Sequence, residues 1–438
     1  MQRSRRLSVI GAGYVGLATA VGLAAQGHEV DLVETRPDRL ESLLAGFLPI
    51  HEPGMAAAYA DRQTKSRIHP MASPAPGSDL LLVCVGTPID EDGRSDLRQV
   101  ESALRSVAAL AASGTPVVIR STLPAGSGET IVKWLGGDSS RVFANPEFLR
   151  QGHAIEDFLK PTRVVIGAFP HVDPDALALV KEVLYFGDGP LLVVGMAEAD
   201  LIKNGANAFL ALRLSFANEL AVLCEALGAD VIKVIEGIGL DKRLGSGYMQ
   251  PSFGFGGSCL PKDLRALTNV GKNFGLKMHV TSAASEANAD HQQHFAERVV
   301  GLMPPGSRRV AILGLAFKAG TDDVRSSPSL HVAQILIERG LEVVGFDPQV
   351  AAMATREVPG LSVADSAQSA VAGAGVVVIG TEWPEFRDLD WATLATTMAA
   401  PTVIDGRRLL DGERMRALGY HFETIGASAG IRVARASS

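Results

Sequence analysis

A cysteine in a glycine-rich loop is the residue of this chain best suited to nucleophilic chemistry. Residues 253–263 read FGFGGSCLPKD, which places Cys259 directly before a predicted helix that has a proline in its first turn. The positive end of a helix lowers the pKa of a neighbouring thiol, and the thiolate is the reactive form. We therefore expect Cys259 to be approachable and reactive, with a buried structural thiol as the alternative. We interpret Cys84, in a predicted strand, and Cys224, on a long predicted helix, as buried structural thiols.

A glycine turn follows the first predicted strand. Residues 11–16 read GAGYVG. Gly11 allows a tight turn, Gly13 lets the backbone approach a pyrophosphate, and Gly16 lets the next helix pack closely against the strand. The N-terminus of that helix then faces the phosphates. The pattern predicts a dinucleotide site, and a glycine-rich turn in another doubly wound fold is the alternative.

The acid that ends the next predicted strand indicates which dinucleotide binds. Glu34 lies 18 residues after Gly16. A carboxylate in this place can accept a hydrogen bond from a ribose 2′-hydroxyl and repels a 2′-phosphate, which favours NAD over NADP. Arg36, two residues later, is a weaker signal in favour of NADP.

The elements that must position these groups begin as an alternation of strands and helices. The first third of the chain has a predicted helix at 15–26 and several short apolar runs of strand length. The predicted strands are 7–10, 29–34, 80–85, 116–120, 142–144 and 163–166. Such alternation predicts a parallel sheet with helices on both faces.

The middle of the chain predicts one unusually long helix. Residues 198–228 contain no proline, and their apolar residues recur at helical spacing. About 31 residues at 1.5 Å each span roughly 45 Å, which suits a spine between two domains. Further helices are predicted to begin at Asp230 and at Pro261.

The last third of the chain repeats the opening pattern. A helix is predicted at 329–339, with strands at 309–314, 341–347, 376–380 and 402–405. We therefore predict an α/β fold of two Rossmann-like, doubly wound sheet domains, joined by the long helix and a helical middle domain. The predicted domains are 1–196, 197–304 and 305–438.

Composition excludes several classes of protein. Hydrophobic residues make up 47% of the 438 residues and charged residues 20%, so the chain can form a large core. Its 41 basic and 48 acidic residues give a net charge of −7, without the basic footprint of a nucleic-acid-binding protein. No apolar run approaches the roughly 20 residues that cross a bilayer. Three widely spaced cysteines favour a reducing compartment, and we expect a cytoplasmic protein.

Taken together, the motifs resemble the nucleotide-sugar 6-dehydrogenase family, which includes UDP-glucose and GDP-mannose dehydrogenases. They keep the family's order and cover nearly the whole chain. The motifs are GAGYVG at 11–16, VCVGTP at 83–88, RST at 120–122, NPEFLR at 145–150, EADLIKNGAN at 198–207, GGSC at 256–259, GLAFK at 314–318 and TDDVR at 321–325.

The resemblance implies a four-electron oxidation of the sugar C6 alcohol to a carboxylate, with NAD as the acceptor of two hydrides. Cys259 would add to the C6 aldehyde and form a thiohemiacetal. Loss of the second hydride would leave a thioester, which water would hydrolyse. Covalent capture would keep the reactive aldehyde from escaping.

The resemblance also assigns roles to the residues around this cysteine. Lys203 stabilises developing oxyanions and Asn207 donates a hydrogen bond. Asp263 positions a water together with Lys203. Glu147 and Thr122 handle water and protons, with Glu147 as general base for hydrolysis.

Position 151 departs from the family pattern. The family commonly has a second acid four residues after Glu147, but this chain has Gln151. A glutamine can orient a water but cannot take its proton. The base role therefore shifts toward Glu147, and we expect activity to survive.

Ligand contacts follow from the same resemblance. The cofactor contacts are Gly11, Gly13, Tyr14, Val15, Gly16, Glu34, Arg36, Gly86, Thr87, Pro88, Ser121, Thr122 and Arg325. The substrate contacts are Phe148, Leu149, Arg150, Lys203, Asn207, Arg243, Tyr248, Gln250, Ser252, Phe255, Gly256, Gly257, Phe317 and Lys318. Arg243 matches an arginine that crosses a dimer interface to the sugar, which implies a homodimer or a larger assembly.

Residues near the sugar favour UDP-glucose as the substrate. Arg243 is similar to the UDP-glucose branch, and Gln250 stands where the GDP-mannose branch has an arginine. Residues 248–251 and 259–267 nevertheless resemble the GDP-mannose branch. TDP-glucose is a close alternative, because a pocket rejects one added methyl by only about 1–3 kcal/mol.

Other classes of protein share part of this layout. A two-electron 3-hydroxyacid dehydrogenase has a similar sheet domain and long helix, but it needs neither a nucleophilic cysteine nor a second sheet. A catalytically silent NAD-binding protein would tolerate loss of the family's catalytic residues, and only Gln151 favours this class. We expect no metal, because His291 and His294 have no further ligands clustered near them in the sequence.

Overall fold

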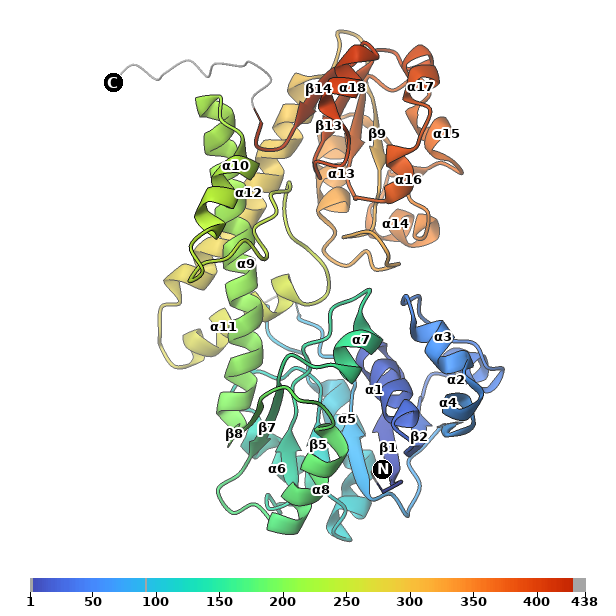
Figure 1. The fold of residues 1–438 in the computed structure, drawn as a ribbon, viewed down its shortest axis with the longest axis vertical. Helices are drawn as coiled ribbons and strands as arrows, with labels where there is room; N and C mark the ends of the chain where they lie inside the picture. Colours follow the sequence, from blue (N-terminus) through green and yellow to red (C-terminus); the bar gives the residue numbers. More distant parts are fainter. Residues whose placement is uncertain (1–2, 91–92, 428–438) are drawn as a thin grey trace. The chain divides into compact units, whose positions relative to one another are not determined.

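The structure is a computed structural model that describes residues 3–90 and 93–427. The chain divides into two compact units, residues 1–206 with 266–276, and residues 207–265 with 277–438. Helices α9 (Met196–Leu227) and α11 (Leu260–Asn273) contribute residues to both units. Each unit is built around one sheet (Figure 1).

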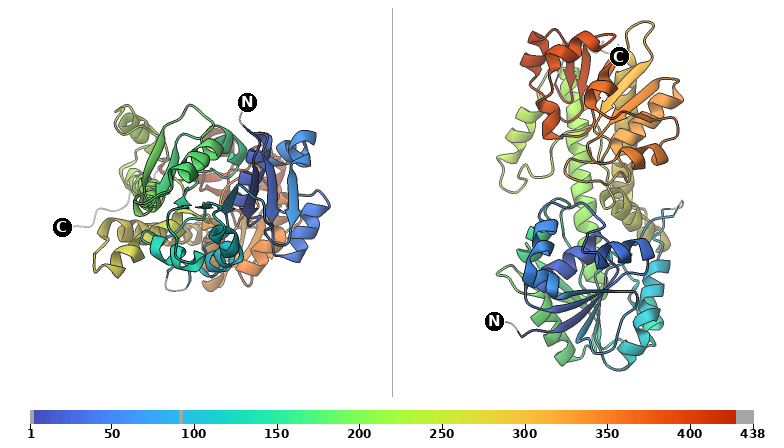
Figure 2. Two further views of the ribbon diagram at one scale, coloured as in Figure 1. Left: turned by 90° about the horizontal axis from the view of Figure 1, so that it is seen from below. Right: turned by 90° about the vertical axis from the view of Figure 1, so that its right-hand side faces the viewer.

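The first unit contains an eight-stranded sheet with the order β3-β2-β1-β4-β5-β6-β7-β8, and helices lie on both of its faces (Figures 1 and 2). Its strands are β1 (Arg6–Ile10), β2 (Glu29–Val33), β3 (Ile68–Met71), β4 (Leu80–Val83), β5 (Val117–Ile119), β6 (Val142–Ala144), β7 (Val164–Ala168) and β8 (Leu191–Gly195). Its helices are α1 (Tyr14–Ala25), α2 (Pro37–Leu44), α3 (Met55–Ala60), α4 (Arg62–Ser66), α5 (Arg98–Ala112), α6 (Gly128–Leu135), α7 (Ala154–Leu159) and α8 (Pro174–Leu184). Because both faces are covered, central strands such as β4 are apolar and buried along their whole length.

The second unit contains a six-stranded parallel sheet with the order β11-β10-β9-β12-β13-β14. Its strands are β9 (Arg309–Leu313), β10 (Glu342–Phe346), β11 (Ser362–Val363), β12 (Val376–Ile379), β13 (Thr402–Asp405) and β14 (His421–Thr424). The remaining helices are α10 (Val231–Gly239), α12 (His279–Gly301), α13 (Pro328–Glu338), α14 (Ala351–Glu357), α15 (Ala367–Val371), α16 (Pro384–Arg387), α17 (Trp391–Thr397) and α18 (Gly412–Ala417). The strand order reverses between β9 and β12, the place where open α/β sheets bind ligands.

One strand pair differs from the predicted parallel sheet. Strands β6 and β7 pair antiparallel, so the end of β6 and the start of β7 lie at the same edge of the sheet. That edge also holds the carboxyl ends of β1, β4 and β5, because these strands run parallel to β6. The connection 145–163 therefore stays beside the glycine turn, and the Tyr14 hydroxyl donates to the Arg150 carbonyl oxygen at 3.1 Å.

The predicted strand 80–85 is too long. Strand β4 ends at Val83, so Cys84 lies just after the strand rather than in it. The Cys84 amide still donates to the Ile10 carbonyl oxygen at 2.8 Å, and the chain then passes close to the glycine turn. Cys84 and Cys224 are both buried, as predicted.

The predicted long helix is confirmed as α9. It has 32 residues, begins two residues earlier than predicted, and spans about 48 Å at 1.5 Å per residue. None of the helices within residues 3–90 and 93–427 has the length and the apolar composition of a membrane span.

Candidate active site

The glycine turn after β1 is shaped for close approach of a phosphate group. Gly11 has a φ of +101°, and a Cβ there would lie 3.0 Å from the Cys84 carbonyl oxygen. A Cβ at Gly16 would lie 1.7 Å from the Gly11 carbonyl oxygen, so only glycine fits. A Cβ at Gly13 would meet nothing within 4 Å, and no side chain caps the N-terminus of α1, where Tyr14 and Val15 lie. The turn therefore fits the pyrophosphate of NAD, whose negative charge suits the amides of a helix N-terminus.

Glu34 stands beside this turn, directly after β2, and is buried. Its Oε1 accepts a hydrogen bond from the Arg36 amide at 2.9 Å. The Arg36 guanidinium pairs with Asp38 at 2.7 Å. A second cation, Arg39, lies 3.9 Å from Glu34 Oε2. The arrangement holds the Glu34 carboxylate in place for a ribose hydroxyl, which supports NAD as the dinucleotide.

Two further loops reach the same edge of the sheet. The Thr87 hydroxyl donates to the Thr122 carbonyl oxygen at 2.8 Å, and the Ser121 hydroxyl donates to the Val85 carbonyl oxygen at 2.7 Å. These bonds join the loop after β4 to the loop after β5. The predicted cofactor contacts Gly86, Thr87, Pro88, Ser121 and Thr122 all lie on these two loops.

Glu147 and Lys203 form a buried ion pair in the first unit. Lys203 Nζ lies 3.1 Å from Glu147 Oε1, and each side chain is less than one-tenth exposed. Glu147 Oε2 also accepts a hydrogen bond from the Leu149 amide at 2.7 Å. Burial raises the pKa of Glu147, but the Lys203 ammonium, the Leu149 amide and the Arg120 guanidinium outweigh it and lower the pKa below its ordinary value. Glu147 is therefore ionised at neutral pH and able to accept a proton.

The residues that follow Glu147 have different surroundings. The Phe148 ring lies 5.5 Å from Lys203 Nζ and 3.7 Å from the Arg163 guanidinium. Arg150 is exposed and pairs with Asp157 at 2.7 Å. Among the predicted substrate contacts of this loop, Phe148 lies beside the ion pair and Arg150 is already engaged by a carboxylate.

Asn207 and Asp263 form a second buried pair, which belongs to the second unit. Asn207 Nδ2 donates to Asp263 Oδ2 at 2.5 Å. Lys262 donates to the other oxygen of the same carboxylate. Asp263 is fully buried in the first turn of α11, and its amide donates to the Cys259 carbonyl oxygen at 2.8 Å. Asp263 is thus rigidly held one helical turn from the cysteine.

Cys259 is exposed and directly precedes α11, as predicted. Its glycine-rich loop packs against residues 317–326. A Cβ at Gly257, where φ is +85°, would lie 2.8 Å from the Phe317 ring, and one at Gly256 would lie 2.1 Å from the Ser326 carbonyl oxygen. The glycines therefore let the loop approach this segment closely.

Arg325 supplies positive charge beside the thiol. Two hydrogen bonds of 2.7 and 2.8 Å fix its guanidinium on Asp323. The pKa of Arg325 is raised, first by these bonds to Asp323 and also by the charge of Cys259. A nearby cation and a helix N-terminus both favour the thiolate form of a cysteine.

The other predicted substrate contacts of the second unit differ in exposure. Ser252 is buried, where its amide donates to the Asn218 side-chain oxygen at 2.9 Å, while Phe255 is held by Asn288. Tyr248 and Gln250 are exposed. In the segment 248–257, hydrogen bonds therefore hold Ser252 and Phe255 in place, while Tyr248 and Gln250 are accessible at the surface.

Two predicted cationic contacts complete this set. Lys318 Nζ lies 5.8 Å from the Phe317 ring. Arg243 is exposed and pairs with Asp241 at 2.6 Å. Both cations are therefore present on the second unit, with Arg243 at its surface.

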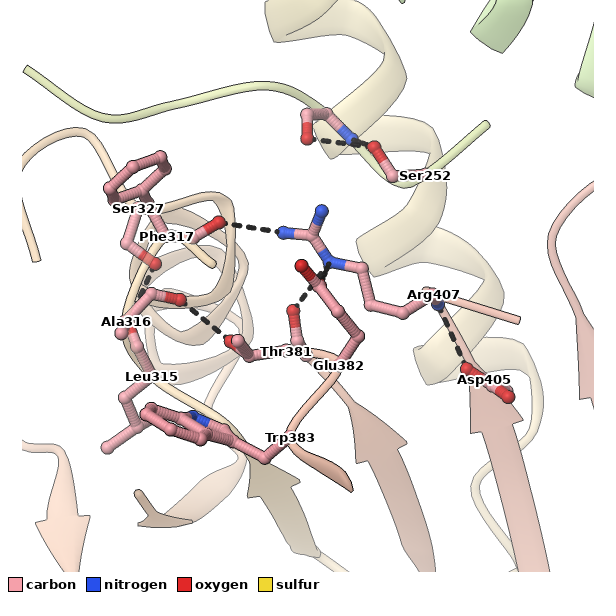
Figure 3. A network of polar contacts seen from close by, with 12 residues as sticks. Ser252, Leu315, Ala316, Phe317, Ser327, Thr381, Glu382, Trp383, Asp405 and Arg407 are labelled. Carbon is pink, nitrogen blue, oxygen red and sulfur yellow. Dashed lines mark hydrogen bonds and ion pairs between the residues drawn. The ribbon is translucent and has the colours of Figure 1, made fainter. Parts of the chain in front are cut away.

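Arg407 is a candidate functional residue that the sequence did not single out (Figure 3). It follows β13, donates to the Gly380 and Phe317 carbonyl oxygens at 2.8 and 3.2 Å, and lies 3.5 Å from Glu382. Its guanidinium also lies 5.2 Å from the Phe253 ring. The cluster stands at the carboxyl ends of β12 and β13, where open α/β sheets bind ligands. An arginine two residues after a buried strand was the available sequence signal.

The structure brings the predicted catalytic residues together in two sets. Glu147, Lys203 and Thr122 belong to the first unit. Cys259, Asp263 and Asn207 belong to the second. Lys203 and Asn207 are four residues apart on α9, as predicted, but their partners differ.

Comparison with known proteins identifies the family. Three family models match in chain order: the NAD binding domain of the UDP-glucose/GDP-mannose dehydrogenase family at residues 5–185, its central domain at 197–290, and its UDP binding domain at 311–412. A UDP-glucose 6-dehydrogenase of Rhizobium meliloti (strain 1021) is 36% identical over 434 residues, which cover 96% of this chain and 99% of the relative.

Solved structures agree with this assignment. A UDP-glucose dehydrogenase from the archaeon Pyrobaculum islandicum matches with a TM-score of 0.86 and 36% identity, over 98% of this chain and 99% of that chain. A GDP-mannose dehydrogenase from Pseudomonas aeruginosa matches with a TM-score of 0.52 and 30% identity, over 96% and 99% of the two chains. The chain belongs to the UDP-glucose/GDP-mannose dehydrogenase family and is an NAD-dependent dehydrogenase.

Proposed function

We propose that this chain oxidises UDP-glucose at C6 to UDP-glucuronate, with two NAD⁺ consumed for each sugar and Cys259 as the covalent nucleophile. The observation that carries the proposal is the exposed Cys259 at the start of α11 with the Arg325 guanidinium beside it. A thiolate is the form that adds to a carbonyl carbon. A two-electron dehydrogenase needs no such nucleophile.

The two oxidations require a hydride acceptor and groups that manage protons and oxyanions. Bound NAD supplies the acceptor for both hydrides. Lys203 and Asn207 are assigned to the oxygen on C6, where a cation and an amide stabilise negative charge. Thr122, on the loop after β5, is assigned to proton and water handling with Glu147.

The covalent steps centre on Cys259. Its sulfur forms a bond to the aldehyde carbon, and the carbonyl electron pair moves to oxygen to give a thiohemiacetal. Removal of a hydride from that carbon leaves a thioester. Attack of water then breaks the carbon–sulfur bond, releases the carboxylate and returns the thiolate.

Glu147 is proposed as the base for that last step. Its pKa is lowered below the ordinary value despite burial, so the carboxylate is ionised at neutral pH and can accept the proton of the attacking water. Gln151 orients the water without taking its proton. Asp263, which Asn207 and Lys262 hold in place, is assigned to a second water position.

The second sheet is proposed to bind the nucleotide part of the substrate. The family's UDP binding domain matches residues 311–412, which include Phe317, Lys318 and Arg407. Arginine and lysine provide the positive charge that a diphosphate requires. The family segments fit our proposed domains 1–196, 197–304 and 305–438.

An apolar stripe on α9 supports a homodimer. Phe209, Phe216 and Leu223 recur every seven residues and are 60%, 49% and 53% exposed. Exposed apolar residues at this spacing suit a second copy of the same helix. We propose that two copies pair through this stripe and that the exposed Arg243 reaches the partner's sugar. Light scattering should give twice 46.0 kDa for the unmutated chain and a monomer for Phe216→Asp.

The proposed reaction takes place in the cytoplasm. All three cysteines are free thiols, including the exposed Cys259. A thiolate nucleophile persists in a reducing compartment, where disulfides are rare.

GDP-mannose is the second candidate substrate, because residues 248–251 resemble that branch. TDP-glucose is a third, since a pocket discriminates weakly against a methyl group. The experiment compares kcat/KM for UDP-glucose, TDP-glucose and GDP-mannose with NAD. We expect UDP-glucose to be preferred, and Cys259→Ser to lose about 10³-fold or more in kcat. Cys224→Ala, which changes a thiol buried in an apolar core cluster, is the matched control.

Each outcome of this comparison is informative. Turnover of GDP-mannose alone would overturn the proposed substrate and keep the mechanism. Full activity of Cys259→Ser would overturn the mechanism. Absence of turnover with all three sugars would overturn the proposed function.

A further inference from the structure

Arg120 is a buried arginine at the base of the loop that carries Glu147. It directly follows β5 and is only 6% exposed. Its Nη1 donates to the Asn145 side-chain oxygen, and its guanidinium lies 5.6 Å from the Phe158 ring. Asn145 begins the loop and Phe158 belongs to α7, which ends it. One guanidinium therefore contacts both ends of the loop.

Asn145 fixes this arrangement to the sheet. Its Nδ2 donates to the Val165 carbonyl oxygen of β7 at 2.7 Å, and its amide donates to the Ile119 carbonyl oxygen of β5 at 2.8 Å. The Arg120 guanidinium is thus held by a side chain that is itself held by two strands. Unlike a lysine on a flexible stem, it cannot turn away without breaking these contacts.

The charged groups that face Glu147 come from three elements. Lys203 on α9 makes the direct ion pair, and Arg120 after β5 acts through space. Cys84, after β4, lies near both, but burial raises the pKa of its thiol to about 11 and it stays neutral. Two cations therefore surround one carboxylate in this part of the described structure.

This excess of cations bears on the proposed function, on which the inference rests. Lys203 is assigned to the substrate oxyanion, yet in the structure it pairs with Glu147. If it were the sole cation near Glu147, its movement to the substrate would leave a buried carboxylate with the Leu149 amide but no countercharge. Such a group takes up a proton and stops being a base.

We propose that Arg120 is a positioning residue, whose fixed guanidinium keeps Glu147 ionised and in place while Lys203 turns to the substrate. Lys203 is then the mobile cation and Arg120 the stationary one. This division lets one carboxylate serve as partner of Lys203 at rest and as base during hydrolysis.

The test is the pH dependence of kcat with UDP-glucose for the unmutated chain, Arg120→Gln and Arg120→Lys. Removing a nearby cation raises the pKa of a carboxylate, so the acid limb of the Arg120→Gln profile should move up by about one pH unit. On that limb kcat should fall about tenfold, with KM for NAD nearly unchanged. Arg120→Lys keeps the positive charge, so its acid limb should lie close to that of the unmutated chain.

Arg163→Gln is the matched control. Arg163 is partly buried and lies over the Phe148 ring of the same loop, but its charge is not among those that shift Glu147. Its acid limb should stay in place. A folded Arg120→Gln protein with an unmoved acid limb would overturn the proposal.

A stability cycle covers the case in which Arg120→Gln fails to fold. Glu147→Gln removes the carboxylate that needs neutralising, so Arg120→Gln should fold in that background and lose only its contacts with Asn145 and Phe158. Its cost in unfolding temperature should therefore be smaller there than in the unmutated chain. If the double variant also fails to fold while Glu147→Gln folds, Arg120 is structural and the proposal is wrong. The cycle needs no substrate, so it separates failure of this inference from failure of the proposed function.

Discussion

Two glycine turns of this molecule share a topology and differ in what fills them. Gly11 follows β1 and Gly314 follows β9, each the first strand of its sheet in the chain and each with a left-handed φ, of +101° and +96°. After the first turn, α1 begins at Tyr14 with no side-chain cap. After the second, the amides of Leu315 and Ala316 donate to Asp347 Oδ2 at 2.7 and 3.0 Å. The protein's own carboxylate occupies the second turn.

The acids that end the second strand of each sheet explain the difference. Glu34 follows β2 and accepts from the Arg36 amide on its own segment. Asp347 follows β10 and accepts hydrogen bonds from the turn after Gly314 and from Trp383 Nε1, the latter at 3.1 Å. Helix α13 also begins only at Pro328, well after the turn. The two turns therefore have the same strand topology but different uses. In the second turn a side chain of the protein is already bonded to the backbone amides, whereas the first turn leads into a helix N-terminus without a side-chain cap, which can bind a dinucleotide phosphate.

The largest expected effect comes from breaking the filled turn. Asp347→Ala removes the acceptor of three buried N–H donors, and we expect it to lower the free energy of unfolding by about 3 kcal/mol. Urea unfolding followed by tryptophan fluorescence measures this loss. Asp347→Asn keeps one acceptor oxygen and should lose about half as much. NAD affinity should be unchanged in both variants, and a weakened NAD site would show that the turns are not independent.

The next effect comes from narrowing the open turn. Gly13→Ala adds a methyl group that meets no protein atom within 4 Å, so folding should be unaffected. The methyl group should instead push the phosphates away and raise the Kd for NAD by about tenfold, or 1.4 kcal/mol. Isothermal titration with NAD measures this change. Gly237→Ala, on α10 with equally open surroundings, is the control. Unchanged NAD affinity in Gly13→Ala would place the phosphates elsewhere.

The smallest effect sharpens the role of the first acid. Glu34→Gln keeps the shape of the side chain but removes the charge that repels a 2′-phosphate. We expect the Kd for NAD to rise by about fivefold, near 1 kcal/mol, and that for NADP to fall. Steady-state kinetics with both cofactors reports the ratio. If Glu34→Gln left the ratio of activity with NAD to activity with NADP unchanged, the role given to this carboxylate would be contradicted.

Local signals predicted much of this fold from the sequence. The predicted strands 142–144 and 402–405 coincide with β6 and β13, because short apolar runs between turn residues are recognised within the segment itself. The exposure of Cys259 was also predicted correctly, since its glycine neighbours and the following proline are adjacent to it.

Long-range contacts were beyond such signals. Asp347 and Arg407 resemble ordinary charged residues in the sequence, and the RST motif that begins at Arg120 does not indicate what this arginine contacts. The partners of all three lie on strands or loops far along the chain. The antiparallel direction of β7 likewise depends on pairing with β6 rather than on its own residues. The sequence could therefore indicate which loops carry chemistry, but not which buried charges hold them.

The central claim is that one chain removes two hydrides from each sugar through Cys259. Its most direct test mixes the chain in excess over UDP-glucose with saturating NAD and counts the NADH formed per sugar. We predict two NADH per sugar for the unmutated chain and fewer than two for Cys259→Ser, whose hydroxyl is a poorer nucleophile than a thiolate. One NADH per sugar in the unmutated chain, or two in Cys259→Ser, would contradict the account.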